Sequence, residues 1–209
     1  MSDIPAPRAW ADPLIGRIAK ESITSSMVRA TWERHHDKGS GLEVFAEVMA
    51  NQPAAYAIYE EEIYPRLFYN IRGDMHVGQR YKELFRFKLG ISHGCYLCNT
   101  SNWQTTRDVG FTQEQLDNAL KPTPELFTDA ELAILDLAEL FVLWNTDAQL
   151  TPDLYERLLG HFGDAGIVEL GILGAFFMGF QRMLFAFDLV PREQSCPIAA
   201  YSEMVSDPA

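Results

Sequence analysis

The stretch Gly94-Cys95-Tyr96-Leu97-Cys98 decides how the rest of this chain is interpreted. It places two of the three cysteines of the chain three positions apart, directly after a glycine. Residues at i and i+3 of a helix lie on one face, one turn apart. If a helix begins here, Cys95 lies at its N-terminus, where unpaired N–H groups and the helix dipole favour a thiolate. The stretch therefore predicts a helix start that carries a reactive pair of thiols.

The pair has three interpretations. In a redox pair, the second thiol attacks the sulfenic acid or mixed disulfide that forms on the first. Alternatively, the cysteines are two small buried residues, or they bind a metal. A zinc site needs four ligands, and His93 is the nearby residue of a suitable type. We favour the redox pair, and we expect neither a metal nor a cofactor.

Helix signals extend in both directions from the pair. Gly110 lies where a residue that follows a helix is expected. Thr112 with Gln115 matches a capping box, in which the first and fourth residues satisfy each other's backbone N–H groups. Thr128 with Glu131 matches a second one. No segment alternates with period two for long enough to predict a strand. The patterns predict helices over residues 14–34, 42–50, 54–71, 79–91, 95–109, 112–120 and 128–144, from 151 onward, and over 164–187.

The predicted fold is therefore all-α, a single domain of about eight to ten helices. A chain of 209 residues is long enough to bury a large core. We expect an N-terminal arm and helix over residues 1–40, a helical domain over 41–190 and a C-terminal tail over 191–209. The tyrosine-rich segment 56–69 is expected to supply core and subunit contacts.

Composition and charge narrow the range of partners. The chain is 47% hydrophobic and carries 17 basic against 29 acidic residues, which gives a net charge of −12. This balance argues against nucleic acid or an anionic membrane surface as a partner. The longest uninterrupted apolar run, over 170–180, is too short to span a bilayer, and no basic segment followed by an apolar one opens the chain. We expect a cytoplasmic protein.

The sequence on either side of the cysteine pair resembles that of a known family. Glu83 lies twelve residues before Cys95, and Gly110-Phe111-Thr112 follows the pair. This pattern resembles the core motif of the AhpD-like superfamily, which contains alkylhydroperoxidase D and the carboxymuconolactone decarboxylases. The resemblance covers about residues 53–190, including 127–133, 154–161, 167–171 and 181–182. It implies an all-α AhpD-like fold with the pair at a helix start facing a pocket, and a homo-oligomer, either a trimer or a hexamer.

The resemblance also implies roles for individual residues. In the peroxidase branch, Cys98 would attack the peroxide, Cys95 would close the disulfide, and Glu83 would be the general base of a proton relay. One position departs from the family pattern, because Asn102 stands where a histidine is usual. An amide does not titrate, so it cannot pass a proton on. His93, two residues before the pair, is a candidate substitute.

Two charged residues have other interpretations. On residue type alone, Glu83 is expected to form a surface ion pair with Lys82 or Arg86 on its own helix. Arg182 lies within an apolar segment and needs a carboxylate partner, for which Glu83 and Asp188 are candidates.

Three functions remain open on the sequence alone. The favoured one is a thiol-dependent oxidoreductase that reduces hydroperoxides or partner disulfides, with a thiol or disulfide reductant protein as its partner. The second is a decarboxylase-like lyase that acts on a small metabolite by acid/base chemistry, without a cysteine pair. The third is a non-enzymatic redox sensor. Cys196 would be either an inert thiol or a resolving partner.

Overall fold

The computed structural model describes residues 13–37, 43–142, 145 and 148–190. This part of the chain is all-α and holds no strand, which confirms the predicted fold class. The first twelve residues of the predicted arm, the predicted tail and Cys196 lie outside the described residues. The helices are η1 (Lys20–Ser22), α1 (Ser26–Asp37), α2 (Glu43–Met49), α3 (Pro53–Ala57), η2 (Ile58–Phe68), α4 (Gln79–His93), α5 (Tyr96–Asp108), α6 (Gln113–Asp117), α7 (Asp129–Glu139) and α8 (Pro152–Ala186).

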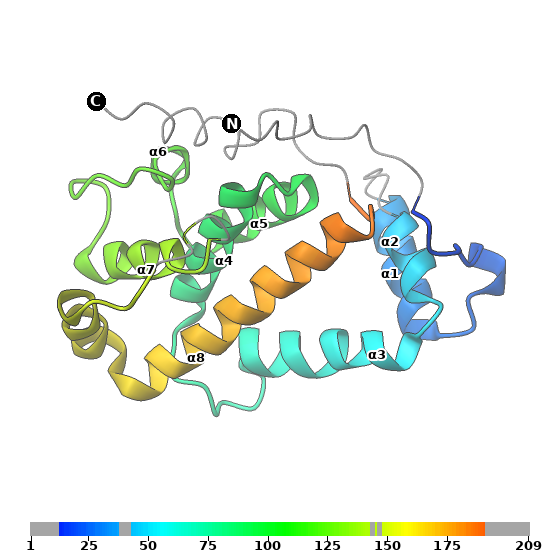
Figure 1. Cartoon of the computed structure of the whole chain (residues 1–209), viewed down its shortest axis with the longest axis horizontal. Coiled ribbons are helices and arrows are strands. Elements are labelled where there is room, and N and C mark those ends of the chain that lie inside the picture. The colour runs from blue at the N-terminus through cyan, green and yellow to red at the C-terminus, as the bar shows by residue number, and fades with distance from the viewer. Residues whose placement is uncertain (1–12, 38–42, 143–144, 146–147, 191–209) are drawn as a thin grey trace.

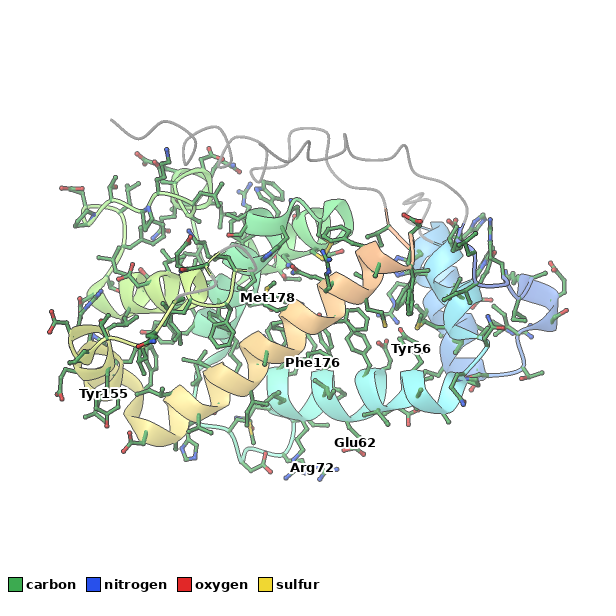
Figure 2. The ribbon with its side chains drawn as sticks, in the orientation of Figure 1. Tyr56, Glu62, Arg72, Tyr155, Phe176 and Met178 are labelled. Atoms are coloured by element: carbon green, nitrogen blue, oxygen red, sulfur yellow. A yellow bond between two sulfur atoms is a disulfide. The ribbon has the colours of Figure 1, made fainter. Side chains whose placement is uncertain are left out.

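The centre of the fold is α4, which packs against α5, α7 and α8. It is buried on nearly every side, and Leu84, Phe85 and Leu89 are fully covered. Figure 1 shows α8 crossing the molecule diagonally, from α7 at one end to α1 and α2 at the other. Along this path α8 also contacts η2. Side chains including Tyr56 and Phe176 lie between α8 and the α3–η2 segment (Figure 2).

The lysine and arginine side chains of α4 each pair with a carboxylate. A buried cation requires such a partner, because leaving the charge alone in the interior is strongly destabilising. The N···O distances lie between 2.5 and 3.1 Å. The pairs are Arg80 with Glu131, Lys82 with Glu169, Arg86 with Glu83, and Lys88 with Glu139.

The Lys82–Glu169 pair ties α4 to α8 in the interior. Lys82 Nζ lies 2.5 Å from Glu169 Oε1 and also donates to the carbonyl of Leu67 at 2.6 Å. The other carboxylate oxygen of Glu169 accepts the backbone N–H groups of His76 and Val77 at 2.7 and 3.2 Å. The pair therefore also fixes the loop that leads into α4.

The structure confirms the helix starts and helix ends that local sequence signals predict. Both predicted capping boxes are present, at Thr112 and Thr128. Gly110 follows α5 with a φ of +95°, a conformation that glycine adopts without a steric penalty. The helices predicted from 151 and from 164 form α8, which is interrupted at Gly163 (φ 64°, ψ 170°). Such a backbone conformation is essentially restricted to glycine, so Gly163 sets the break.

The helix predicted over 14–34 is wrong in its first half. There the chain forms only the short turn η1, and α1 begins at Ser26. Ser25 Oγ accepts the N–H of Val28 at 3.4 Å, and the N–H of Ile18 donates to the carbonyl of Glu47 at 3.1 Å. Serine and threonine side chains compete with the backbone in this way, which favours caps and turns over helix interiors.

The helix α8 combines core packing with exposed apolar side chains, among them Val168 and Ile172. By length and composition it is apolar enough to cross a membrane, contrary to the expectation from the longest apolar run, and 44% of its most apolar window is buried. Core helices of globular proteins share this property, and Leu170, Leu173 and Phe177 of α8 belong to the main core. Arg182 is exposed on α8, so it does not need the carboxylate partner that the sequence predicts.

Candidate functional site

The two cysteines occupy the first turn of α5. Gly94 follows α4 in the left-handed conformation, with a φ of 61°, and turns the chain into α5. Cys95 is the N-cap of α5, and its Sγ accepts the N–H of Cys98 at 3.3 Å. The two residues are joined by a disulfide, with their Cα atoms 5.2 Å apart. The predicted helix start at the cysteine pair is thus present.

A close approach of α4 and α5 holds Cys98 in place. A Cβ atom on Gly90 would lie 3.1 Å from Asn102 Nδ2, 3.2 Å from Asn99 Oδ1 and 3.3 Å from Cys98 Cβ. These contacts are tighter than ordinary van der Waals contact. Glycine at this position of α4 therefore lets the cysteine-bearing turn of α5 lie directly against α4.

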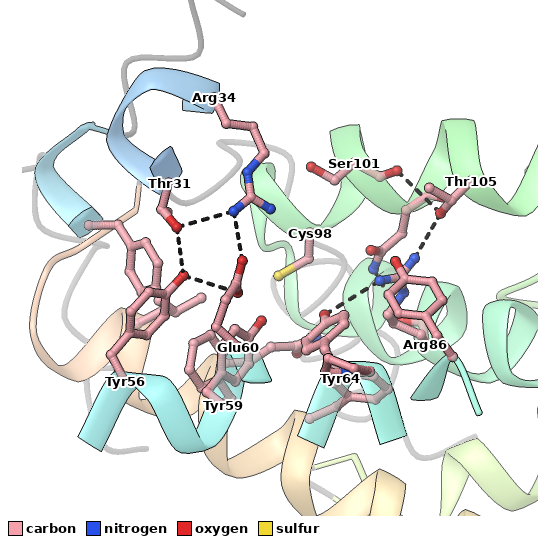
Figure 3. Close-up of a pocket in the computed structure, with 18 of the residues that line it drawn as sticks. Thr31, Arg34, Tyr56, Tyr59, Glu60, Tyr64, Arg86, Cys98, Ser101 and Thr105 are labelled. Atoms are coloured by element: carbon pink, nitrogen blue, oxygen red, sulfur yellow. Dashed lines mark hydrogen bonds and ion pairs between the residues drawn. The ribbon is translucent and has the colours of Figure 1, made fainter. Parts of the chain in front are cut away.

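Cys98 opens onto a cavity of about 460 Å³, whereas Cys95 is fully buried. Residues of α1, α2, α3, η2, α4, α5 and α8 line this cavity. Figure 3 shows the sulfur of Cys98 pointing into it. Seven of the lining side chains are aromatic: Phe45, Tyr56, Tyr59, Tyr64, Tyr69, Phe177 and Phe180. A volume of this size suits an organic molecule.

A hydrogen-bonded polar cluster closes one end of the cavity (Figure 3). Arg34 lies 2.7 Å from Glu60 Oε1 and donates to Thr31 Oγ1 at 3.1 Å. The hydroxyl of Tyr56 lies 3.2 Å from both Glu60 Oε2 and Thr31 Oγ1. Burial is the main cause that raises the pKa of Tyr56, so its phenol stays protonated. This end of the cavity offers both donors and acceptors.

The tyrosines of η2 form a second wall. This segment is π-helical and contains Pro65, which has no N–H to donate to the helix. Tyr59 stacks on Phe180 with the ring centroids 4.1 Å apart, and its centroid lies 4.9 Å from that of Tyr64. Burial raises the pKa of Tyr59 well above its ordinary value, so this phenol is also neutral.

Glu83 lies behind the cavity wall rather than on it. It is buried, and its Oε2 atom is 2.5 Å from Arg86 Nη2. Thr105 Oγ1 donates to the same oxygen at 2.9 Å, and Gln79 Nε2 donates to Oε1 at 3.1 Å. Arg86 and Thr105 line the cavity, whereas Glu83 is not among the described residues that line it. The ion pair with Arg86 is thus present, but in the interior and not on the surface.

Asn102 and His93 occupy different surroundings. Asn102 lines the cavity beside Cys98, and its Nδ2 donates to the carbonyl of Arg86 at 3.5 Å. His93 is buried and is not among the described residues that line the cavity. Its Nδ1 donates to the carbonyl of Leu89 at 2.8 Å. Burial lowers the pKa of His93. The structure therefore brings Cys98 and Asn102 together and leaves His93 outside this group.

Sequence reasoning missed the opposite wall of the cavity. Tyr59, Glu60 and Tyr64 fall in the segment for which the sequence predicts core and subunit contacts, and the sequence indicates no role at the site for Gln181. The available signal was Glu60, a carboxylate within an aromatic run. Among the described residues, no three His, Cys, Asp or Glu side chains are grouped as they would be to hold a metal ion.

Comparison with known proteins adds one structural likeness. No family model and no curated protein matches this sequence. A crystal structure of a protein of unknown function from Agrobacterium tumefaciens, provisionally described as the antioxidant defence protein AhpD, is similar with a TM-score of 0.50 and 22% identity. The match covers 66% of this chain and 97% of that one. At this identity the likeness concerns the fold alone, and it agrees with an all-α single domain.

Proposed function

We propose that this protein is a thiol-dependent oxidoreductase that reduces a small-molecule hydroperoxide through Cys98 and Cys95. One observation carries the proposal: Cys98 faces a cavity of organic size, while its disulfide partner is fully buried next to it. The antioxidant description of the A. tumefaciens protein is in keeping with this function.

The chemistry begins with the reduced pair. The thiolate of Cys98 attacks the outer oxygen of the hydroperoxide, an S–O bond forms, the O–O bond breaks, and the alkoxide takes up a proton to leave as the alcohol. Cys95 then attacks the sulfur of the resulting sulfenic acid, the disulfide forms, and water leaves. Two thiols and one hydroperoxide thus give a disulfide, an alcohol and water. A dithiol reductant restores the pair.

The position of the pair favours this sequence of steps. Both sulfurs lie in the first turn of α5, where unpaired backbone N–H groups stabilise a thiolate. Cys95 Sγ accepts the N–H of Cys98, and the structure holds the two sulfurs as a disulfide, which is the product of the second step. The pair is thus arranged to close once Cys98 is oxidised.

We propose that Glu83 takes part in proton transfer at Cys98. Glu83 does not line the cavity, so we propose that it acts through the hydroxyl of Thr105, which donates to it and lines the cavity, while Arg86 stays charged and holds Glu83 in place. Asn102, beside Cys98, orients the thiol or the peroxide by hydrogen bonding and transfers no proton. His93 lies outside this path.

Thiol counting tests the proposal. The protein is reduced, freed of reductant and treated with one equivalent of cumene hydroperoxide, and free thiols and cumyl alcohol are then measured. The wild type is expected to lose two thiols and form one alcohol per chain. Cys95→Ser should form the alcohol once and stop at the sulfenic acid, which a dimedone adduct detects. Cys98→Ser should form no alcohol.

Cys196→Ser is the control, because the proposed pair is intact in it. It should behave as the wild type does, apart from one fewer thiol. Unchanged alcohol formation in Cys98→Ser would overturn the proposal, and so would a wild type that keeps all its thiols.

A further inference from the structure

Two polar atoms of cavity-lining residues are buried without a hydrogen-bond partner among the described residues. They are Nε of Arg86, on α4, and Oε1 of Gln181, on α8. Nearly all buried polar atoms in folded proteins are hydrogen-bonded, and a buried atom without a partner is destabilising. Both residues are more than nine-tenths buried. The residues that line the cavity therefore carry one donor and one acceptor that the described residues leave unsatisfied.

These two atoms define what a complementary ligand must carry. The Nε–H of Arg86 donates, so it needs an oxygen that accepts. The carbonyl oxygen of Gln181 accepts, so it needs an O–H or N–H group. A hydroxyl or hydroperoxyl group supplies both, because its oxygen accepts while its hydrogen is donated.

The aromatic side chains around the cavity indicate that the apolar part of the ligand is an aromatic ring. Tyr59 and Phe180 line the cavity and stack with their ring centroids 4.1 Å apart. Phe176 is not among the described lining residues and packs on the same two rings, with centroids 5.5 and 5.9 Å away. Tyr64 contacts Phe177 with ring centroids 5.9 Å apart. Aromatic groups add edge-to-face and offset-stacked contacts to the gain from apolar burial, and a saturated ring lacks these contacts.

We propose that the cavity binds an aromatic compound that carries a hydroxyl or hydroperoxyl group, held by Arg86 and Gln181. This inference rests on the proposed function and names its substrate class: an aromatic hydroperoxide, which leaves as the corresponding alcohol. The aromatic ring packs against the wall formed by Tyr59 and Phe180. Gln181 is then a specificity-determining residue for the reaction at Cys98.

Three matched probes test the ligand class without any chemistry at the cysteines. They are 2-naphthol, naphthalene and decahydro-2-naphthol, and each is titrated by calorimetry into the disulfide form of the full chain. We expect 2-naphthol to bind about tenfold more tightly than naphthalene, because it adds two hydrogen bonds. It should also bind about tenfold more tightly than decahydro-2-naphthol, which keeps the hydroxyl and loses the aromatic ring.

The variant Gln181→Leu tests where the hydroxyl of 2-naphthol binds. Gln181→Leu removes the acceptor with little change of volume, so the affinity for 2-naphthol should fall to that for naphthalene. The affinity for naphthalene itself should not fall. Gln52→Leu is the control, because Gln52 is exposed and outside the cavity lining. It should bind all three probes as the wild type does.

The inference is overturned if 2-naphthol does not bind, or binds no better than the other two probes. If Gln181→Leu keeps the preference for the hydroxyl, the assignment of Gln181 is wrong. These outcomes are independent of the thiol chemistry. Hydroperoxide reduction without binding of 2-naphthol refutes the ligand class alone, and selective binding without loss of thiols refutes the proposed function alone.

Discussion

The guanidinium of Arg86 lies 2.5 Å from the carboxylate of Glu83, and both side chains are buried one turn apart on α4. Arg86 also donates to Thr105 Oγ1 at 2.8 Å and lies 4.4 Å from the centre of the Phe68 ring. Glu83, for which the sequence resemblance implies the role of a base, is thus half of an internal ion pair. Any part that it takes in proton transfer passes through its neighbours.

Breaking this pair should destabilise the fold strongly. Arg86→Met leaves the carboxylate of Glu83 buried without its cation, and we expect a loss of about 3–5 kcal/mol in the free energy of unfolding. Adding Glu83→Gln in the same chain should restore much of it, because the remaining group carries no charge. Urea denaturation at pH 7 measures each variant.

The surface pair of Arg72 and Glu62, at 3.7 Å, provides the control (Figure 2). Both side chains are more than half exposed, so Arg72→Met should change stability by less than about 1 kcal/mol. Equal losses in Arg72→Met and Arg86→Met would contradict the internal role of the Arg86–Glu83 pair.

Local signals account for what the sequence predicted well. The capping boxes at Thr112 and Thr128, and the helix start at Cys95, each depend on residues within one turn. The far wall of the cavity could not be predicted in this way. Arg34 and Glu60 come from α1 and η2, and tertiary packing alone brings them opposite Cys98. The same limit explains why burial of the Glu83 ion pair was missed.

Enlarging Gly90 should disturb both packing and thiol chemistry. The added Cβ of Gly90→Ala would meet Asn102, Asn99 and Cys98 at 3.1–3.3 Å. We expect a loss of about 1–3 kcal/mol in stability, as for other overpacked sites. The rate at which Cys98 reacts with a thiol reagent should change as well. Urea denaturation and stopped-flow thiol titration measure the two effects.

Gly171→Ala is the matched control within α8, since a Cβ atom added there would meet no neighbouring atom within 4 Å among the described residues. Alanine favours a helix over glycine, so this variant should gain up to about 1 kcal/mol. A loss in Gly171→Ala, or no loss in Gly90→Ala, would show that the close approach of α4 and α5 is not the cause.

His93 should make stability depend on pH. Burial lowers its pKa below the ordinary value of 6.5, against the opposing effects of the Leu89 carbonyl and Glu139. The unfolded chain therefore binds a proton at a higher pH than the folded chain does. The free energy of unfolding should fall as the pH drops through 6.5 toward the folded pKa of His93.

His93→Asn isolates this contribution. Its amide can still donate to the carbonyl of Leu89, but it does not titrate. Urea denaturation between pH 8 and pH 5 should show a shallower fall for His93→Asn than for the wild type. Parallel curves for the two proteins would show that His93 is not the group responsible.

Asn102 stands where the resembling family usually has a histidine, so a substitution there tests whether a proton carrier at this position speeds the reaction. It lies beside Cys98 in the cavity wall, 5% exposed, and its amide cannot take up a proton. Asn102→His would place a titrating group there, and general acid–base catalysis typically contributes about 10²–10⁴-fold. We expect hydroperoxide reduction to accelerate by about 10²-fold at most, because the new ring is not pre-oriented. The rate should gain a pH dependence near the ordinary histidine pKa of about 6.5.

Asn102→Gln, which enlarges the side chain and keeps an amide, is the control and should show neither effect. An equal change of rate in both variants would mean that size, and not proton transfer, governs this position.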